Sequence, residues 1–144
     1  MAREIKNIRK ENAQEVLDAT SAVVGRVASF AAKEALLGNR VIIVNSEKAI
    51  IIGKKANIIQ KYKARITRGK GKQKGPYFPR GPEAILRRAI RGMLPYDKKR
   101  GREAFKYVRC YVSVPPEFKD AEKIQLGKDI PADSITLEEV SRLI

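Results

Sequence analysis

RVIIVN, residues 40–45, and AIIIG, residues 49–53, are β-branched runs in which apolar and polar side chains do not alternate. A strand with one face in water alternates, whereas a strand covered on both faces, as in a parallel sheet packed between helices, is apolar throughout. We therefore expect both runs to be strands of an α/β protein. Because only residues 46–48 separate them, they are either adjacent short strands or a strand followed by the start of the next element.

The segment before these runs predicts a strand and a buried helix. Residues 15–19 are typical of a short strand, and residues 23–37 are rich in Ala and Leu and contain no Pro. Thr20 or Ser21 could cap the start of this helix, and Gly38 suits its C-terminal end. Few polar residues interrupt the helix, so we expect it to be largely buried.

The segment after these runs alternates helices with basic loops. Residues 54–62 and 82–93 predict helices, the second with a Pro and an acid in its first turn. Residues 65–80 and 96–102 are rich in like charges, and the longer one also contains three Gly and two Pro, so we expect both to be loops. Residues 108–114 predict a further strand, which two prolines close.

Length and composition suit one intracellular domain. The chain has 144 residues, 43% of them hydrophobic, a single cysteine and no His, which argues against a disulfide within the chain or a zinc site. The N-terminus lacks the apolar core of a secretory signal, and the apolar runs are too short to cross a bilayer. We expect one cytoplasmic domain over residues 1–144, with a core at about 15–116, a tail at 117–144 and no membrane partner. Thr136 and Glu139 have capping-box spacing in a predicted helix of the tail.

Positive charge is concentrated in one stretch of the chain. Residues 54–109 hold nineteen of the 31 Lys and Arg residues but only three of the 16 acids, and the remainder is close to neutral. Like charges crowded together repel and destabilise the compact state, so such an excess implies a partner that neutralises it. A polyanion, above all a nucleic acid, fits best.

The predicted helix at 82–93 separates apolar from basic residues. At 100° per residue its apolar side chains fall on one arc, and Arg87, Arg88 and Arg91 fall on the opposite arc. One face can therefore dock on the core while the other presents a row of three guanidinium groups. The planar guanidinium fork suits phosphate, and we expect this row to face RNA rather than to be a merely solvated surface.

The basic loop at 65–80 contains Tyr77 and Phe78 among its cations. Its glycines allow the backbone to approach phosphates closely, and aromatic rings can stack on exposed bases. Packing of the two rings against the domain is an equally good interpretation, and the sequence leaves both open.

Other functions find little support in the residues. The glycines of residues 69–75 do not have dinucleotide-fingerprint spacing, and the turn before Gly25 is better explained as a tight strand-to-helix connection than as a phosphate site. Without His, and without paired carboxylates in the basic region, we expect no enzyme, no metal and no small-molecule substrate. Cys110 lies in an apolar pattern and is best explained as a core residue. A nonspecific DNA-compacting protein stays an alternative.

The stretch RGPEAILRRAIRGMLP at 80–95, followed by KRGREAF at 99–105, closely resembles the signature of a universal family of large-subunit ribosomal proteins, the thirteenth in the family numbering. Two further segments match the family in the same order along the chain. They are Asp18-Ala19 followed by GRVAS at 25–29, and VNSEKAI at 44–50 followed by Gly53. The wording of residues 99–105 is closer to the archaeal and eukaryotic branch than to the bacterial one. The resemblance covers about residues 16–116.

This resemblance implies a three-layer α/β/α domain with a central, mostly parallel four-stranded sheet and basic loop extensions. It also implies a structural protein without cofactor that binds large-subunit ribosomal RNA early in assembly, beside neighbouring ribosomal proteins of the large subunit. Family members bind through basic loops and helix faces. We accordingly expect RNA contacts from Lys54, Lys55, Lys61, Lys63, Arg65, Arg68, Lys70, Lys72, Lys74, Tyr77, Arg80, Arg87, Arg88, Arg91, Lys98, Lys99, Arg100 and Arg102.

Overall fold

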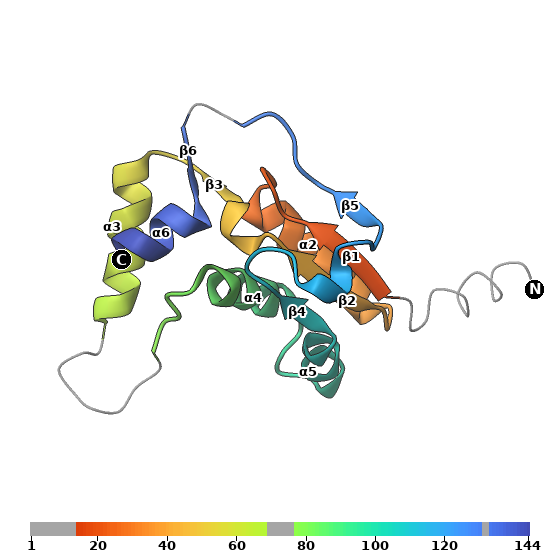
Figure 1. Cartoon of the computed structure of the whole chain (residues 1–144). Coiled ribbons are helices and arrows are strands. Elements are labelled where there is room, and N and C mark those ends of the chain that lie inside the picture. Colours follow the sequence, from red (N-terminus) through yellow and green to blue (C-terminus); the bar gives the residue numbers. More distant parts are fainter. Residues whose placement is uncertain (1–13, 69–76, 131–132) are drawn as a thin grey trace, which may run out of the picture.

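A four-stranded, entirely parallel sheet forms the centre of the fold (Figure 1). The computed structural model describes residues 14–68, 77–130 and 133–144. The strands stand in the order β4-β2-β1-β5, and they comprise β1 (Gln14–Asp18), β2 (Arg40–Val44), β4 (Val108–Cys110) and β5 (Lys123–Gln125). The α/β class and the mostly parallel four-stranded sheet are thus confirmed.

Strand β2 shows why its sequence does not alternate. It pairs with β1 on one side and with β4 on the other, and its residues 41–44 are all buried. Val41 and Ile43 join the larger apolar cluster, whereas Ile42 and Val44 join a second cluster with Phe118. Both faces of β2 are therefore covered, as the apolar run at 40–45 predicted.

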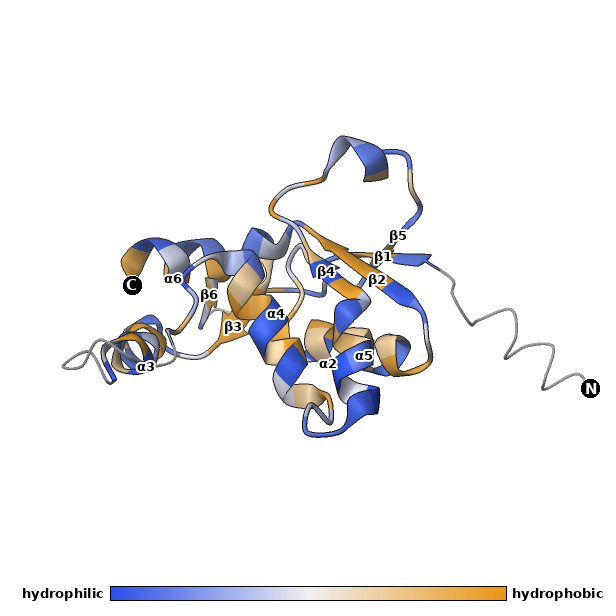
Figure 2. Ribbon diagram, turned by 90° about the horizontal axis from the view of Figure 1, so that it is seen from below, coloured by the Kyte–Doolittle hydropathy of each residue, from blue (hydrophilic) through white to orange (hydrophobic). Residues whose placement is uncertain are grey.

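Helices cover one face of the sheet (Figure 2), namely α2 (Val24–Leu36), α4 (Pro82–Met93) and α5 (Lys99–Lys106). Small residues of α2 such as Ala28, Ala31 and Ala35 are fully or almost fully buried, and α2 packs directly against α4 and α5. The opposite face is covered by the segment that contains the short 3-10 helix η2 (Pro116–Phe118), so the layer on that side is thin.

The start of α2 differs from the sequence prediction, whereas its end agrees. The N-cap is Val23, and no side chain caps the helix; the Thr20 hydroxyl instead donates to Asp18 Oδ1 over 2.7 Å. The prediction that Thr20 or Ser21 caps the helix is therefore wrong, because Thr20 is engaged in the turn after β1. Gly38 follows the last turn with a φ of +91°, a conformation that suits glycine.

The run at 49–53 is a strand, but it lies outside the central sheet. After the 3-10 helix η1 (Ser46–Lys48), β3 (Ile50–Ile52) pairs antiparallel with β6 (Ser134–Thr136). Ile52 is 52% exposed, so the expectation that this run is covered on both faces is wrong. The strand leads into α3 (Lys55–Thr67), and β6 leads into α6 (Leu137–Leu143), whose predicted cap is confirmed because Glu139 N–H donates to Thr136 Oγ1.

Three boundaries in the basic half also differ from the sequence prediction. Helix α3 continues to Thr67, so Arg65 is helical and not in a loop. Residues 99–102, predicted as loop, open α5, where Gly101 lies so close to the Pro95 carbonyl that a Cβ atom would clash with it. Strand β4 ends at Cys110 rather than at residue 114. The chain turns at Ser113, which has a φ of +58° and donates its N–H to the buried Glu47 carboxylate.

The segment at 117–144, set apart above as a tail, contributes β5 to the central sheet and supplies β6 and α6. No helix in the described part of the chain is long and apolar enough to span a membrane.

Candidate nucleic-acid interface

The predicted RNA-binding side chains lie at the protein surface wherever the structure describes them. Each of these residues, from Lys54 in front of α3 to Arg102 in α5, is exposed. Lys70, Lys72 and Lys74 lie outside the described residues. The concentration of charge along the sequence therefore corresponds to an exposed basic surface formed by α3, α4 and α5, together with Arg80 just before α4 and Lys98 just before α5.

Helix α4 has the two faces that its sequence predicted, except at its last residue, because Met93 of the apolar arc is 45% exposed. Ile85 is 3% exposed, and Leu86 and Ile90 are fully buried, while the three arginines on the opposite arc are exposed. The helix starts with Pro82 after the N-cap Gly81, an arrangement that needs no N–H from the first residue. Burial of the apolar arc against α2 fixes the direction in which the arginines point.

Two of these arginines stack on aromatic rings at the junction of α4 and α5. The guanidinium carbon of Arg87 lies 4.1 Å from the ring centre of Phe105, and that of Arg91 lies 4.1 Å from the ring centre of Tyr96. The two rings meet edge to face, with centres 5.8 Å apart. Together with Pro79, Ala84 and Arg88, these side chains line a groove of about 300 Å³. We call it the α4–α5 groove.

The third arginine of the row, Arg88, stacks on a ring that also contacts α3. Arg88 lies 4.8 Å from the ring centre of Phe78, and Arg65 of α3 lies 5.7 Å from the same ring. Phe78 in turn contacts Tyr62 edge to face, with ring centres 5.7 Å apart. The predicted row is thus divided between two aromatic clusters, because Arg88 lies about 100° around the helix from Arg87.

The choice left open for the two loop aromatics is now resolved for Phe78. Phe78 packs against the main apolar cluster and joins α3 to α4, which is the packing role. Tyr77 is 81% exposed, so most of its ring is accessible to a partner. The two neighbours therefore have different environments, although they are adjacent in the sequence.

Stacking orders these guanidinium groups without neutralising them. A cation over a ring is stabilised by about 0.5–1 kcal/mol at an exposed site, and the N–H groups stay available for hydrogen bonds. Among the described residues, the ion pairs join Lys55 to Glu139 at 3.7 Å and Lys99 to Glu103 at 3.9 Å. No described acid pairs with an arginine of α4, so the arrangement suits an external anion.

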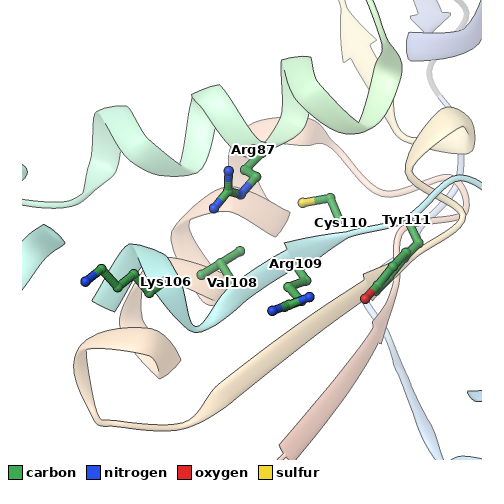
Figure 3. A pocket seen from close by; sticks show the side chains of 6 residues that line it. All are labelled: Arg87, Lys106, Val108, Arg109, Cys110 and Tyr111. Atoms are coloured by element: carbon green, nitrogen blue, oxygen red, sulfur yellow. The ribbon is translucent and has the colours of Figure 1, made fainter. Parts of the chain in front are cut away.

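Lys106 and Arg109 are exposed cations that the list of predicted contacts omitted. Both belong to the basic stretch at 54–109, which could have identified them. Lys106 also follows Arg102 by four residues, so the two lie on the same side of α5. With Arg87 they line a second groove beside β4 (Figure 3).

The turn after β1 is a poor phosphate site. Asp18 Oδ1 accepts hydrogen bonds from Thr20 N at 3.0 Å and from Asn45 Nδ2 at 3.1 Å. Burial raises the pKa of Asp18, but the hydrogen bonds from Thr20 and Asn45 and the charge of Lys48 outweigh this effect and hold the pKa below its ordinary value. A carboxylate therefore lies at the start of the turn that leads from β1 to α2, where it would repel a phosphate.

Cys110 does not have the properties of a nucleophile. Burial raises the pKa of its thiol to about 12, despite the opposing charge of nearby Arg87, so the thiol is protonated at neutral pH. Its side chain packs against the main apolar cluster, as the sequence predicted. Among the described residues, no group of three or more His, Cys, Asp or Glu side chains could hold a metal ion.

Comparison with known proteins agrees with the resemblance seen in the sequence. The family model of ribosomal protein L13 matches residues 13–117. The large ribosomal subunit protein uL13 of Archaeoglobus fulgidus is 44% identical over 135 residues, which cover 90% of this chain and 86% of the relative. The proteins of the same name from Methanosarcina barkeri and Haloarcula marismortui are 49% and 38% identical, over 78% and 96% of this chain and 80% and 95% of their own lengths. The chain therefore belongs to the ribosomal protein L13 family, a family of structural, non-enzymatic constituents of the large ribosomal subunit.

Proposed function

We propose that this protein binds large-subunit ribosomal RNA through the basic surface of α3, α4 and α5 and stabilises that RNA early in subunit assembly. One observation carries the proposal. Arg87, Arg88 and Arg91 stand on a helix whose other face is buried in the core, are held by aromatic rings, and pair with no described acid.

The physical role of this surface is charge neutralisation. RNA segments that approach one another repel through their phosphates, and cations fixed between them lower that repulsion while releasing condensed counterions. Because the core holds α4 in place, little side-chain freedom is lost when its guanidinium groups meet phosphate oxygens. Most contacts then go to phosphate and sugar, and specificity arises from the shape of the folded RNA.

The rest of the molecule fits the same role. We propose that residues 1–144 act as one domain in the cytoplasm, within the large subunit. The face opposite α4 and α5 is covered around Phe118, and residues 117–130, which include this cover and β5, hold four acids and three lysines. Neighbouring ribosomal proteins are the natural partners for this less basic side.

The proposal is tested first by the salt dependence of binding to a large-subunit ribosomal RNA transcript. For about ten phosphate contacts, the slope of log affinity against log salt is on the order of −7 to −9. A slope shallower than about −3 would contradict the proposal. Competition with random duplex DNA at physiological salt tests the alternative of a DNA-compacting protein. If the proposal is correct, the DNA should displace the RNA only at large excess.

The arginines are tested by replacing all three together, Arg87→Gln, Arg88→Gln and Arg91→Gln. RNA affinity is expected to fall by about two orders of magnitude, since three charge-assisted contacts are lost. Stability should fall by about 1.5–3 kcal/mol, from the three lost stacking contacts. The control replaces Arg26, Lys119 and Lys128 by Gln, which removes the same charge from exposed sites outside the basic stretch. Equal affinity of the two triple variants would refute the role of the arginines.

A further inference from the structure

A groove of about 440 Å³ runs beside β4, on the side away from β2 (Figure 3). Arg87 of α4 lines one part of it. The other lining residues are Lys106 at the end of α5, the three residues of β4 (Val108, Arg109 and Cys110), and Tyr111 directly after β4. In the figure, Arg87 reaches from α4 toward Val108 and Cys110, and Lys106 and Arg109 lie along the other side. We call it the β4-edge groove.

The main chain of β4 has hydrogen-bonding groups to offer at this groove. β4 is an outer strand of the sheet in the described part of the chain. Tyr107 O accepts from Val41 N, and Tyr111 N donates to Ile43 O over 2.8 Å, so these residues bond toward β2. Since alternate residues of a strand point their peptide groups to opposite sides, those of Val108 and Cys110 point away from β2. Val108 is fully buried, so the peptide group of the partly exposed Cys110 is the one that a partner can reach. A partner with a free donor and acceptor would match it.

The charge of the β4-edge groove suits an anionic partner. Among the described residues that line it, Arg87, Lys106 and Arg109 are cations and none is an acid. Neither Lys106 nor Arg109 forms an ion pair with a described acid. The thiol of Cys110 is neutral at physiological pH, so it adds no negative charge.

The β4-edge groove continues the basic surface through a shared residue. Arg87 lines both this groove and the α4–α5 groove, and its guanidinium is fixed over Phe105 between them. A chain that binds the arginines of α4 therefore meets the β4-edge groove next. Continuity with the RNA surface favours RNA over an acidic peptide, although an extended peptide could also pair with a strand edge.

We propose that the β4-edge groove holds an unpaired strand of ribosomal RNA, with phosphates at Lys106 and Arg109 and a base edge at the outward peptide group of Cys110. This inference rests on the proposed function and deepens it, because it specifies a single strand. In a duplex the base edges are already paired with each other, whereas unpaired bases can hydrogen-bond to a protein backbone. Recognition of single strands by such combined charge and base contacts is common.

The test compares the wild-type protein with a Lys106→Gln/Arg109→Gln variant and with a Lys119→Gln/Lys128→Gln control, which loses the same charge from exposed positions outside the groove. The probe is a transcript of Archaeoglobus fulgidus large-subunit ribosomal RNA, with affinity measured over a range of salt and hydroxyl-radical protection mapped along the RNA. For the groove variant we expect about tenfold weaker binding, a salt slope shallower by about 1.4, and loss of protection in one unpaired run.

The outcomes separate this inference from the proposed function. If the wild-type protein binds the RNA and the groove variant matches the control, the β4-edge groove does not bind RNA, while the surface of α4 is unaffected. Loss of protection only in paired nucleotides would overturn the single-strand assignment. Competition by oligouridine of about twelve nucleotides supports the inference if it is weaker for the groove variant than for the control, and contradicts it if both respond alike.

Discussion

Helices α3 and α4 are both basic and differ by one residue in length, yet the fold holds them differently. Helix α4 buries three large apolar side chains and packs against α2, whereas Ile58 is the one buried residue of α3. Most of the stability of a protein helix comes from tertiary packing of its apolar face. The comparison shows that two helices of similar length and charge can differ in how they are held: α4 is packed firmly on the core, whereas α3 is attached by few contacts.

Few contacts attach α3 to the rest of the protein. Ile58 packs beside Gly53, which has a φ of +141°, and the helix lies next to α6 (Figure 1). Lys55 pairs with Glu139 of α6 at 3.7 Å, and Tyr62 meets Phe78 near the other end. Hydrogen exchange in α3 should therefore occur through local opening at a lower free energy than in α4.

The largest expected effect on stability comes from disrupting the packing of α4 on the core. Replacing Leu86, which is fully buried, by Ala should lower the free energy of unfolding by about 2–5 kcal/mol, because a cavity opens between α4 and the core. The measurement is chemical denaturation followed by circular dichroism. The matched change Ile58→Ala should release α3 and leave the exchange protection of β2 unchanged. Equal loss of protection in β2 for both variants would contradict the distinction between the helices.

A smaller effect is expected from removing the ring that joins the two helices. Phe78→Leu keeps an apolar side chain but removes the surface on which Arg65 and Arg88 stack, worth about 0.5–1 kcal/mol for each arginine. RNA affinity should fall about tenfold, and exchange should accelerate in the last turns of α3. The control Tyr77→Leu changes the neighbouring aromatic residue, which is 81% exposed. A faster exchange of α3 in the control than in Phe78→Leu would argue against the bridge.

The smallest effect is expected from the ion pair between α3 and α6. Glu139→Gln removes the partner of Lys55, and both side chains are well exposed, so the cost should be about 0.2–1 kcal/mol. Exchange at the start of α3 is the measurement, compared with Glu138→Gln, which changes a neighbouring exposed acid. Salt should abolish the difference between the variants, since ions screen exposed charges. A difference that persists at high salt would show that Glu139 acts through packing instead.

Local patterns predicted α4 well and α5 poorly. The two arcs of α4 follow from the 3.6-residue period alone, and Pro82 marks its start. In α5 the run Lys99-Arg100-Gly101-Arg102 has unfavourable local charges and a glycine, which led to a loop prediction. The helix forms because Ala104 is buried and Gly101 fits against the Pro95 carbonyl, contacts that join residues from separate elements.

The strand patterns predicted that the sheet is parallel and buried, but not which segments of the chain form its strands. Residues 50–52 have the same β-branched composition as β2, yet they pair with β6, and the fourth strand of the sheet comes from residues 123–125. A three-residue strand such as Lys-Ile-Gln has too few apolar residues for its pattern to be recognised. Partner choice depends on which edge the chain reaches, and this is a property of the complete fold.

The amino-acid sequence by itself determined the α/β class, the basic stretch at 54–109, the amphipathic α4 and the family resemblance, because each depends on residue types at short separations. The tertiary structure decided which rings hold which arginines, how firmly α3 and α4 are held, and that Arg87 joins two grooves. These features require contacts between residues distant in the chain, such as Arg88 with Phe78 and Arg87 with Phe105. Their geometry is set by burial of the apolar faces that bring the elements together.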